Sequence, residues 1–540
     1  MKSYLLLLSL CLTASLLSAQ KAERRSGELL LQLHADAGIQ TVLTQLSRAA
    51  GTPVTIKSLP AAEWRVYLLR FDETQAKLPA LLSTARALPG VNAAQWNHKT
   101  SERKTPNDDF WGQQDNMTLI GMPAAWDVTT GGVTPAGDTI VVAVLEKGTL
   151  LSHPDLAPNI YYNRAETPGN GVDDDGNGYV DDYRGWNPRT GDDDPGVPSF
   201  HGTGVAGIIG ARGNNNEGVA GINWNVKLLC LANVEYEDEI IAAYNYVAKM
   251  RRLYNTSNGQ KGAFITVTNA SFGFDKEWAA DHQLWCAAYD SLGAVGVISV
   301  GATANADVDV DEEGDMPTTC ESEYLITVTN VDKFDNKRSS AGYGNTYIDL
   351  GAPGHNTYTT LSDSQTPKYG YFDGTSAATP HVTGAVALLY SLNCASFTAD
   401  ALSQPELCAR RVRATILENV APNETLAGIT VTGGRLDVQA AVNAVQTLCD
   451  GAVTGPLQIL QIKPNPVFDF LTVNFQTPTY NKYIFRVFNM LGQLIAEDSF
   501  TPDPFVKNEW KFDASLLPLG VYVVSLSRND AVRSEKFVKN

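Results

Sequence analysis

Five apolar runs rich in β-branched residues recur along the middle of the chain, and segments with helical spacing separate them. The runs are TIVVAVLE, NVKLLCLANV, AFITVTNASFG, AVGVISVGA and YLITVTNVD, between residues 139 and 332. They lack the polar alternation of a half-exposed strand, so both faces of their sheet should be buried. Helices between consecutive buried strands predict an α/β fold, in which a parallel sheet carries helices on both faces.

The pattern changes on both sides of this region, and 540 residues are too many for one ordinary domain. From about residue 27 to 97 it reads strand, helix, strand, helix, strand, which predicts a small α+β unit. The last part has short alternating strands such as LTVNF and VYVVSLS, typical of a small β-sandwich. The predicted division is a signal peptide over residues 1–19, an α+β unit over 20–105, the α/β domain over 106–449, a linker over 450–456 and the sandwich over 457–540.

The first twenty residues combine a basic start, an apolar run and small residues at Ser18 and Ala19. This pattern predicts a signal peptide cut near Ala19. An uncleaved anchor helix is the alternative, but the apolar run is short for a membrane span. No later segment is apolar enough to cross a membrane, so the mature chain should have no transmembrane segment. The formal net charge of −18 argues against nucleic acid or anionic lipid as the main partner.

Six of the seven cysteines lie beyond the signal peptide, and an even number in an exported chain permits disulfides. We expect Cys394 and Cys408 to form a local pair. Cys230 lies inside the apolar run VKLLCLA, where a cysteine can remain a buried thiol. The pairing of Cys286, Cys320 and Cys449 stays open.

Two segments rich in small residues carry candidate catalytic side chains. In GTSAATPHVTGAVALL, Ser376 stands between a Gly-Thr turn and an apolar helix, beside the free N–H groups of the helix start. Alone it could be an ordinary N-cap. In HGTGVAGIIGA, His201 begins another helix, and alone it could be a surface histidine. Together with Glu146, at the end of a buried strand, they make a possible nucleophile, base and orienting acid.

These two segments and VVAVLEKGTLLSHPDL resemble the three signature segments of the subtilisin-like serine proteases, in that family's acid–His–Ser order. The resemblance covers roughly residues 106–449. It implies a seven-stranded parallel α/β fold and a secreted endopeptidase that cuts protein or peptide substrates. Ser376 would be the nucleophile and His201 the general base. In position and pattern, residues 20–105 resemble the family's inhibitory propeptide.

The same resemblance assigns two further elements of the site. Asn305, after the run AVGVISVGA, occupies the place of the family's side-chain donor to the oxyanion, where an amide donates without changing charge. Ser271, Phe272 and Gly273 resemble the segment whose backbone pairs with an extended peptide substrate.

The orienting acid departs from the family pattern, because Glu146 stands where the family has Asp. Glu keeps the charge that holds the histidine, and removing that charge costs about 10⁴ in rate. The extra methylene matters less, since a displacement of about 1 Å can cost about 10². We therefore expect a slower or re-shaped triad. An inward-turned Lys147 would compete for Glu146, and the alternative function is a pseudoprotease that binds peptides at the surface without useful turnover.

The stretch NGVDDDGNGYVDDYRGW places oxygen ligands at the spacing of a calcium loop. So many carboxylates in one turn would repel one another without a cation, although a solvated acidic turn is the alternative. Position 12 of the loop is Arg184 rather than Glu, so Asp182 could complete the shell. The predicted Ca²⁺ ligands are Asp173, Asp175, Asn177, the carbonyl of Tyr179, Asp181 and Asp182.

The last segment has a resemblance of its own. IKPNPVFDFLTVNF, VFNMLGQ, LPLGVYVVSL and the terminal RSEKFVKN resemble the C-terminal sorting domain of type IX secretion cargo. The resemblance implies export through the periplasm by the type IX machinery, to the cell surface or the medium. An adhesive or carbohydrate-binding sandwich is the alternative, but no aromatic platform for a sugar is recognisable.

Overall fold

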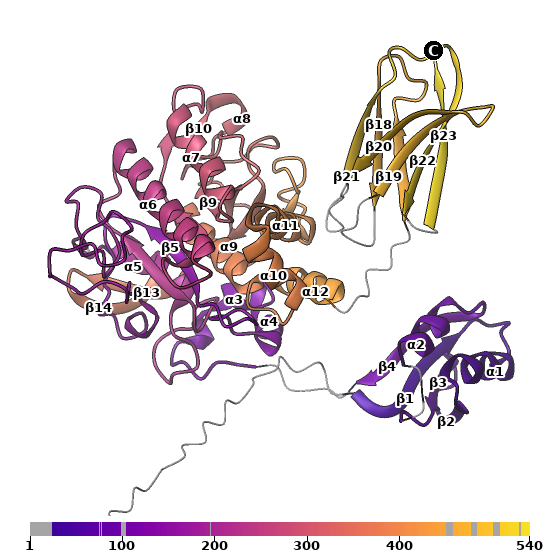
Figure 1. Cartoon of the computed structure of the whole chain (residues 1–540). Helices are drawn as coiled ribbons and strands as arrows, with labels where there is room; N and C mark the ends of the chain where they lie inside the picture. The colour runs from indigo at the N-terminus through magenta and orange to yellow at the C-terminus, as the bar shows by residue number, and fades with distance from the viewer. Residues whose placement is uncertain are drawn as a thin grey trace, which may run out of the picture. The chain divides into compact units, whose positions relative to one another are not determined.

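The computed structural model describes residues 24–98 except 75 and 77, 104–449 except 195, 457–476, 483–500, 508–528 and 531–540. The predicted signal peptide and the predicted linker over 450–456 lie outside these residues. The chain divides into two compact units, Met1–Arg103 and Lys104–Asn540 (Figure 1). No helix of the described residues is both long and apolar enough to span a bilayer.

The N-terminal unit is a four-stranded antiparallel sheet with two helices. The strand order is β2-β3-β1-β4, and buried leucines of β1 contact the apolar face of α1. The strand β2 was not expected from the sequence, because Thr55–Ala61 is exposed over nearly its whole length and shows no apolar alternation. The elements are β1 (Arg24–Leu33), α1 (Ile39–Ala50), β2 (Thr55–Ala61), β3 (Val66–Arg70), α2 (Leu78–Ala87) and β4 (Val91–His98).

An eight-stranded sheet with the order β15-β16-β12-β11-β9-β7-β5-β6 organises the middle of the chain. Seven strands are parallel, and the two-residue edge strand β15 is antiparallel to β16. This confirms the predicted parallel α/β fold. The strands are β5 (Ile140–Leu145), β6 (Lys227–Leu231), β7 (Phe264–Ala270), β9 (Ile298–Ala302), β11 (Leu325–Val331), β12 (Leu350–Pro353), β15 (Ala421–Pro422) and β16 (Gly434–Arg435).

Helices cover both faces of this sheet (Figure 1), and β5 shows why. Its alternate residues enter two different hydrophobic cores, with Val142 in one and Val141 in the other. Buried side chains of α5, α9, α11 and α12 also belong to the first core, and those of α6 and α7 belong to the second. The helices are α3 (Asp115–Leu119), α4 (Met122–Val128), α5 (Phe200–Gly210), α6 (Glu237–Thr256), α7 (Gln283–Gly293), α8 (Val310–Glu313), α9 (Thr375–Leu389), α10 (Ala395–Ser403), α11 (Pro405–Glu418) and α12 (Val438–Cys449).

Two small antiparallel pairs lie outside the main sheet, and both adjoin candidate site residues. The pair β8 (Phe274–Asp275) and β10 (Asp315–Met316) joins the segment after β7 to the segment after α8. The hairpin β13 (Thr357–Asp363) and β14 (Thr366–Phe372) ends three residues before α9 begins.

The C-terminal segment forms a three-stranded and a four-stranded antiparallel sheet around one core, a β-sandwich. Phe485 and Trp510, from different sheets, stack with their ring centroids 4.3 Å apart. The first sheet has the order β17-β18-β21 and the second β20-β19-β22-β23. The strands are β17 (Gln458–Lys463), β18 (Phe470–Gln476), β19 (Tyr483–Asn489), β20 (Leu494–Phe500), β21 (Asn508–Asp513), β22 (Gly520–Arg528) and β23 (Ala531–Lys539).

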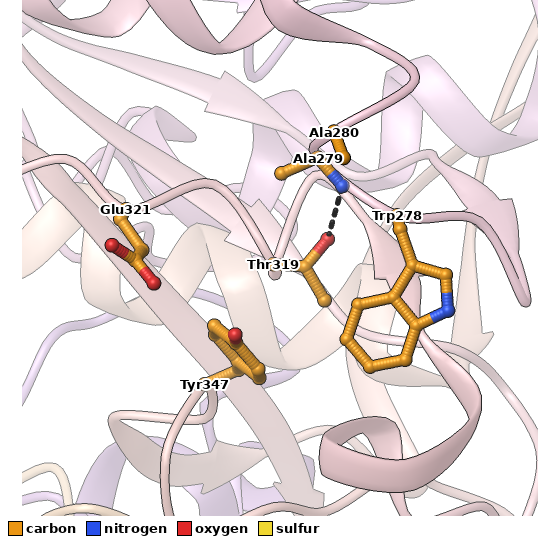
Figure 2. Close-up of a pocket in the computed structure, with 6 residues that line it drawn as sticks. All are labelled: Trp278, Ala279, Ala280, Thr319, Glu321 and Tyr347. Carbon is orange, nitrogen blue, oxygen red and sulfur yellow. Dashed lines mark hydrogen bonds between the residues drawn. The ribbon is translucent and has the colours of Figure 1, made fainter.

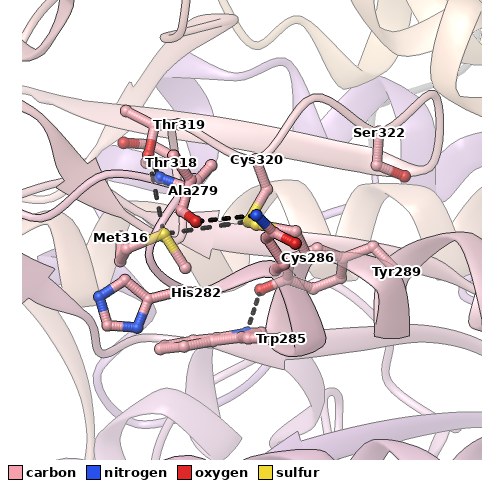
Figure 3. The surroundings of a disulfide bond; sticks show 12 residues. Ala279, His282, Trp285, Cys286, Tyr289, Met316, Thr318, Thr319, Cys320 and Ser322 are labelled. Atoms are coloured by element: carbon pink, nitrogen blue, oxygen red, sulfur yellow. Dashed lines mark hydrogen bonds between the residues drawn. A yellow bond between two sulfur atoms is a disulfide. The ribbon is translucent and has the colours of Figure 1, made fainter.

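Two disulfides are present, Cys286–Cys320 and Cys394–Cys449. The expected pair of Cys394 with Cys408 is therefore wrong. Cys408 is a buried free thiol on α11, and Cys394 instead meets the end of α12, which is far away in sequence. Cys230 is a buried free thiol, as expected. The disulfide Cys286–Cys320 links α7 to the segment after β10 (Figure 3).

Candidate active site

The candidate residues gather because parallel strands end at the same edge of a sheet. Glu146 follows β5, Ser271 follows the neighbouring β7, and Asn305 lies three residues beyond β9. His201 is in the first turn of α5, and Ser376 is in the first turn of α9. Small residues in α5 and α9 let these helices contact each other and the sheet closely.

The Glu146 carboxylate holds the His201 ring with both oxygens. His201 Nδ1 lies 2.9 Å from one oxygen and 3.0 Å from the other. Glu146 is only 3% exposed, so its charge acts on the ring with little screening by water. Lys147 does not compete, because its ammonium pairs with Glu235 at 2.7 Å on the surface.

This environment sets the charge and the orientation of the imidazole. Burial lowers the pKa of His201, but the charge and the hydrogen bond of Glu146 outweigh it, so the net pKa is raised. The ring of Phe372, at the end of β14, packs edge-on against the imidazole, with 5.3 Å between centroids. A histidine whose Nδ1–H donates to a carboxylate keeps Nε2 free to accept a proton.

Ser376 is 7% exposed and its hydroxyl donates to the carbonyl of Ser271 at 3.0 Å. Among the described residues, no hydrogen bond joins Ser376 to His201. A rotation of the hydroxyl away from Ser271 would be needed before His201 could take its proton, and such contacts often tighten only when substrate binds. The backbone N–H of Ser376 lies in the first turn of α9, where amides have no partner within the helix.

A hydrogen bond from Thr375 fixes the orientation of the Asn305 side-chain amide. Its oxygen accepts from the backbone N–H of Thr375 at 2.9 Å, and the Thr375 hydroxyl lies 3.1 Å from the same oxygen. The backbone donor fixes the oxygen there, so the NH₂ group points the other way. The Thr375 hydroxyl also donates to the carbonyl of Thr303 at 2.6 Å, which ties the loop of Asn305 to the turn that presents Ser376. This role of Thr375 was not predicted from the sequence.

The predicted substrate segment lies beside the candidate nucleophile. Ser271 is buried and exchanges two hydrogen bonds with Ser376, one through its carbonyl and one through its hydroxyl. Phe272 packs against Trp285 of α7. Gly273 has no room for a side chain, since a Cβ there would lie 1.8 Å from the carbonyl oxygen of Met316.

Of the predicted calcium ligands, Asp173 and Asp175 come together, and Glu166 joins them. One carboxylate oxygen of each lies within 4.8 Å of the others. Glu166 is 4% exposed, and its Oε2 is buried without a hydrogen-bond partner among the described residues. Burial and the neighbouring Asp175 and Asp174 raise the pKa of Glu166. The sequence spacing could not reveal Glu166, because it precedes the loop.

The other predicted ligands are placed differently. Asp181 accepts from the backbone N–H groups of Asn170 and Gly171. Asp182 is fully buried and accepts from Asn163, Asn177 and Tyr246, and burial raises its pKa to about 6. Asn177 uses its amide oxygen to accept from the backbone N–H of Tyr179. Asp181 and Asp182 are not in the carboxylate group of Glu166, Asp173 and Asp175, whereas the backbone N–H of Asn177 donates to both Asp173 and Asp175.

Two surface cavities lie near β10 rather than at the catalytic side chains. One has a volume of about 430 Å³ and is lined by residues that include Trp278, Thr319, Glu321 and Tyr347 (Figure 2). The other, of about 250 Å³, shares Tyr347 and Glu321 and reaches the Asp349–Arg413 ion pair. Neither is lined by Glu146, His201 or Ser376.

The parallel sheet brings a serine, a histidine and a carboxylate to one edge, so the protein is of the α/β class and has the residue types used in nucleophilic catalysis. Residues 137–443 match the Subtilase family model, more than half of the chain, so the chain belongs to the subtilase family. Residues 461–540 match the Secretion system C-terminal sorting domain, which makes this a secreted or cell-surface protein of the type IX route.

Relatives with this likeness come from distant organisms. The chain is 27% identical over 360 residues to "Subtilisin-like protease 1" of Plasmodium berghei, a match covering 63% of this chain and 55% of that one. It is 28% identical over 385 residues to "Thermophilic serine proteinase" of Bacillus sp. (strain AK1), covering 69% of this chain and 80% of that one. A protease structure from Pseudoalteromonas arctica aligns with a TM-score of 0.44 and 24% identity, covering 63% of this chain and 100% of that one. The chain spans about half the length of the Plasmodium relatives it matches.

Proposed function

We propose that the protein is a secreted serine endopeptidase that cuts protein or peptide substrates through an acyl-enzyme. The observation that carries this proposal is the paired contact of both Glu146 oxygens with His201 Nδ1. A buried carboxylate in this position fixes the tautomer that leaves Nε2 as a base. Ser376 is the nucleophile and Asn305 the side-chain oxyanion donor.

In the first step, the Ser376 hydroxyl oxygen attacks the substrate carbonyl carbon while His201 Nε2 accepts the hydroxyl proton. The carbonyl oxygen becomes negative and accepts from the Asn305 NH₂ group and the Ser376 backbone N–H. The imidazolium then gives its proton to the leaving amine, and an ester of Ser376 remains. Water enters, gives a proton to His201 and attacks the ester. His201 then returns that proton to the departing Ser376 oxygen, which restores the serine hydroxyl and releases the acid product.

Substrate is held as an extended strand along Ser271–Gly273, whose backbone can pair with a peptide. The missing side chain at Gly273 lets this segment lie directly against the Met316 carbonyl. The sorting domain over residues 457–540 is the part that the type IX secretion machinery recognises. Residues 20–105 are the propeptide.

Glu166, Asp173 and Asp175 hold a Ca²⁺ ion in this proposal. The unpartnered, buried oxygen of Glu166 supports it, because such an oxygen beside two carboxylates is costly without a cation. Carboxylate oxygens are the ligands Ca²⁺ takes, and the ion would stabilise the loop between β5 and α5 without entering the reaction.

Reaction with a fluorophosphonate probe tests the catalytic proposal, because the probe labels only an activated serine. We expect labelling of the purified protein and hydrolysis of a generic peptide, and loss of both in Ser376→Ala with the fold unchanged by circular dichroism. An unlabelled, inactive but folded wild type would instead indicate the pseudoprotease. Hydrolysis that persists in purified Ser376→Ala would show that another residue is the nucleophile.

A further inference from the structure

Asp315 is a buried carboxyl group that the proposed reaction does not use. It is 1% exposed and begins β10. Strand β10 pairs with β8, which continues directly from the substrate segment Ser271–Gly273. The close approach of Gly273 to the Met316 carbonyl shows that the two backbones touch. Asp315 therefore lies on the strand that pairs with the continuation of the segment along which a peptide would run.

The other side of Asp315 faces the loop of the oxyanion donor. Thr303 and Ala304, the two residues before Asn305, both act on its carboxylate and lower its pKa against the effect of burial. Asp315 thus lies between residues 271–273 and residues 303–305.

The geometry of the attack indicates which part of the substrate lies between these two segments. The attacked carbonyl carbon must lie at the Ser376 hydroxyl, with its oxygen at Asn305 and the preceding backbone along Ser271–Gly273. The side chain of the residue that supplies this carbonyl then points between the two segments. Asp315 lies between the same two segments.

The charges around Asp315 leave it without a cation. Its nearest donor is the Thr318 hydroxyl at 2.6 Å, and no Lys, Arg or His of the described residues lies within 4.0 Å of its oxygens. The exposed Asp275 stands directly opposite on β8, and Lys276 pairs with Glu313 instead. Burial raises the pKa of Asp315 to about 7. A buried acid without a cationic partner is stabilised when a cationic group arrives.

The segment that carries Asp315 is held rigidly. The backbone N–H and the hydroxyl of Thr319 both reach the Asp315 carbonyl at 3.0 Å. One residue later, Cys320 is bonded to Cys286 of α7 (Figure 3). A charge fixed in this way can select among side chains because it cannot move away from the wrong one.

We propose that Asp315 makes the enzyme selective for Lys or Arg at the residue whose carbonyl is attacked. This inference rests on the proposed peptidase function and adds its substrate class.

The test compares matched peptides that differ only at this residue, with Lys, Arg or Leu. We expect the wild type to have a kcat/KM at least about 30-fold higher for Lys and Arg than for Leu, the effect of one buried charge pair. Asp315→Asn keeps the shape and should lower the Lys/Leu ratio by about 30-fold or more, with the Leu rate changed less than about threefold. Asp275→Asn, on the facing strand, is the control and should change the ratio by less than about threefold.

Three results would overturn the inference. The first is a wild type that cuts the Leu peptide as fast as the Lys peptide, and this result needs no variant, so it counts even if Asp315→Asn fails to fold. Equal loss on all three peptides would show that Asp315 only positions the loops. A ratio that shifts as much in Asp275→Asn would place selectivity elsewhere. Fluorophosphonate labelling separates these outcomes from failure of the peptidase function, since an unlabelled wild type removes the function and the inference with it.

Discussion

Glu146 stands where the family has Asp, and the structure shows how the site accommodates the longer side chain. The structure shows a carboxylate that reaches His201 with both oxygens, so the extra methylene is accommodated within the hydrogen-bonding distance. Its neighbour Lys147 faces outward to Glu235. A site shaped around Glu rather than damaged by it is the simplest interpretation.

Substitution of Glu146 tests this interpretation. Glu146→Gln keeps the size but removes the charge and can favour the wrong tautomer, so kcat/KM should fall by about 10³ to 10⁴. Glu146→Asp withdraws the carboxylate by about 1 Å and should cost about 10². Turnover of one generic peptide by the three proteins measures the order. A faster Asp variant would mean that the site is still shaped for Asp, and an equally active Gln variant would show that Glu146 does not orient His201.

The raised pKa of His201 predicts the acid limit of activity. The base must be neutral, so kcat/KM should fall on acidification through an ionisation above the ordinary histidine value of about 6.5. In Glu146→Gln, only burial remains to act strongly on the ring, and the residual activity should lose its acid limb at lower pH. A pH profile of kcat/KM for both proteins measures this shift. An identical limb in both would mean that another group controls it.

At the scale of elements, the sequence was informative where burial was uniform. The five apolar runs all became buried strands of the main sheet, including the edge strand β6, because strands buried on both faces need apolar residues at nearly every position. The short strands β12 and β16 and the exposed β2 were missed, since their sequences lack this pattern. The family signatures marked the segments that the fold brings to one edge, but they could not reveal Glu166, Thr375 or Asp315. These residues matter through contacts between distant segments.

Helix α9 carries a second buried histidine that should make stability depend on pH. His381 Nδ1 donates to the Ala377 carbonyl, and Nε2 accepts from Asn116, so the ring is neutral. Burial lowers its pKa to about 4. Because the folded pKa is below the unfolded value of about 6.5, this contribution is complete above pH 6.5 and is lost as pH falls towards 4. The loss amounts to about 3 kcal/mol.

Thermal unfolding of Ser376→Ala at pH 7 and pH 4.5 measures this effect without self-digestion. Asn116→Asp, added to that background, places a carboxylate at Nε2 and should make the protein less sensitive to acid. An equal drop in melting temperature in both proteins would show that His381 does not govern the acid response.

The acidic loop before α5 predicts stabilisation by calcium. Saturating Ca²⁺ should raise the melting temperature by several degrees, about 5 °C, by mass action. Glu166→Gln should remove most of that rise. Asp174→Asn is the matched control, because Asp174 lies in the same loop but accepts from Thr167 and Asn170. Melting temperatures unmoved by Ca²⁺ and by chelation, or equal effects of both variants, would contradict this site.

At the scale of the whole molecule, the chain joins a compact N-terminal unit, a subtilase domain and a sorting domain. The stretch between residues 97 and 110 is polar and follows a folded unit, a favourable place for proteolysis. We predict that the enzyme cuts itself there. Purified wild type should lose residues up to this stretch with time, and Ser376→Ala should stay intact. N-terminal sequencing locates the cut, and processing of purified Ser376→Ala at the same rate would exclude self-cleavage.

The disulfide Cys394–Cys449 has a mechanical consequence. It fastens the end of α12 to the start of α10, immediately before the chain continues towards the sorting domain. A tensile load applied to that tail during export would reach a covalent bond before it reached the turns of α12. A pull on the tail would therefore not unwind the last helix of the subtilase domain.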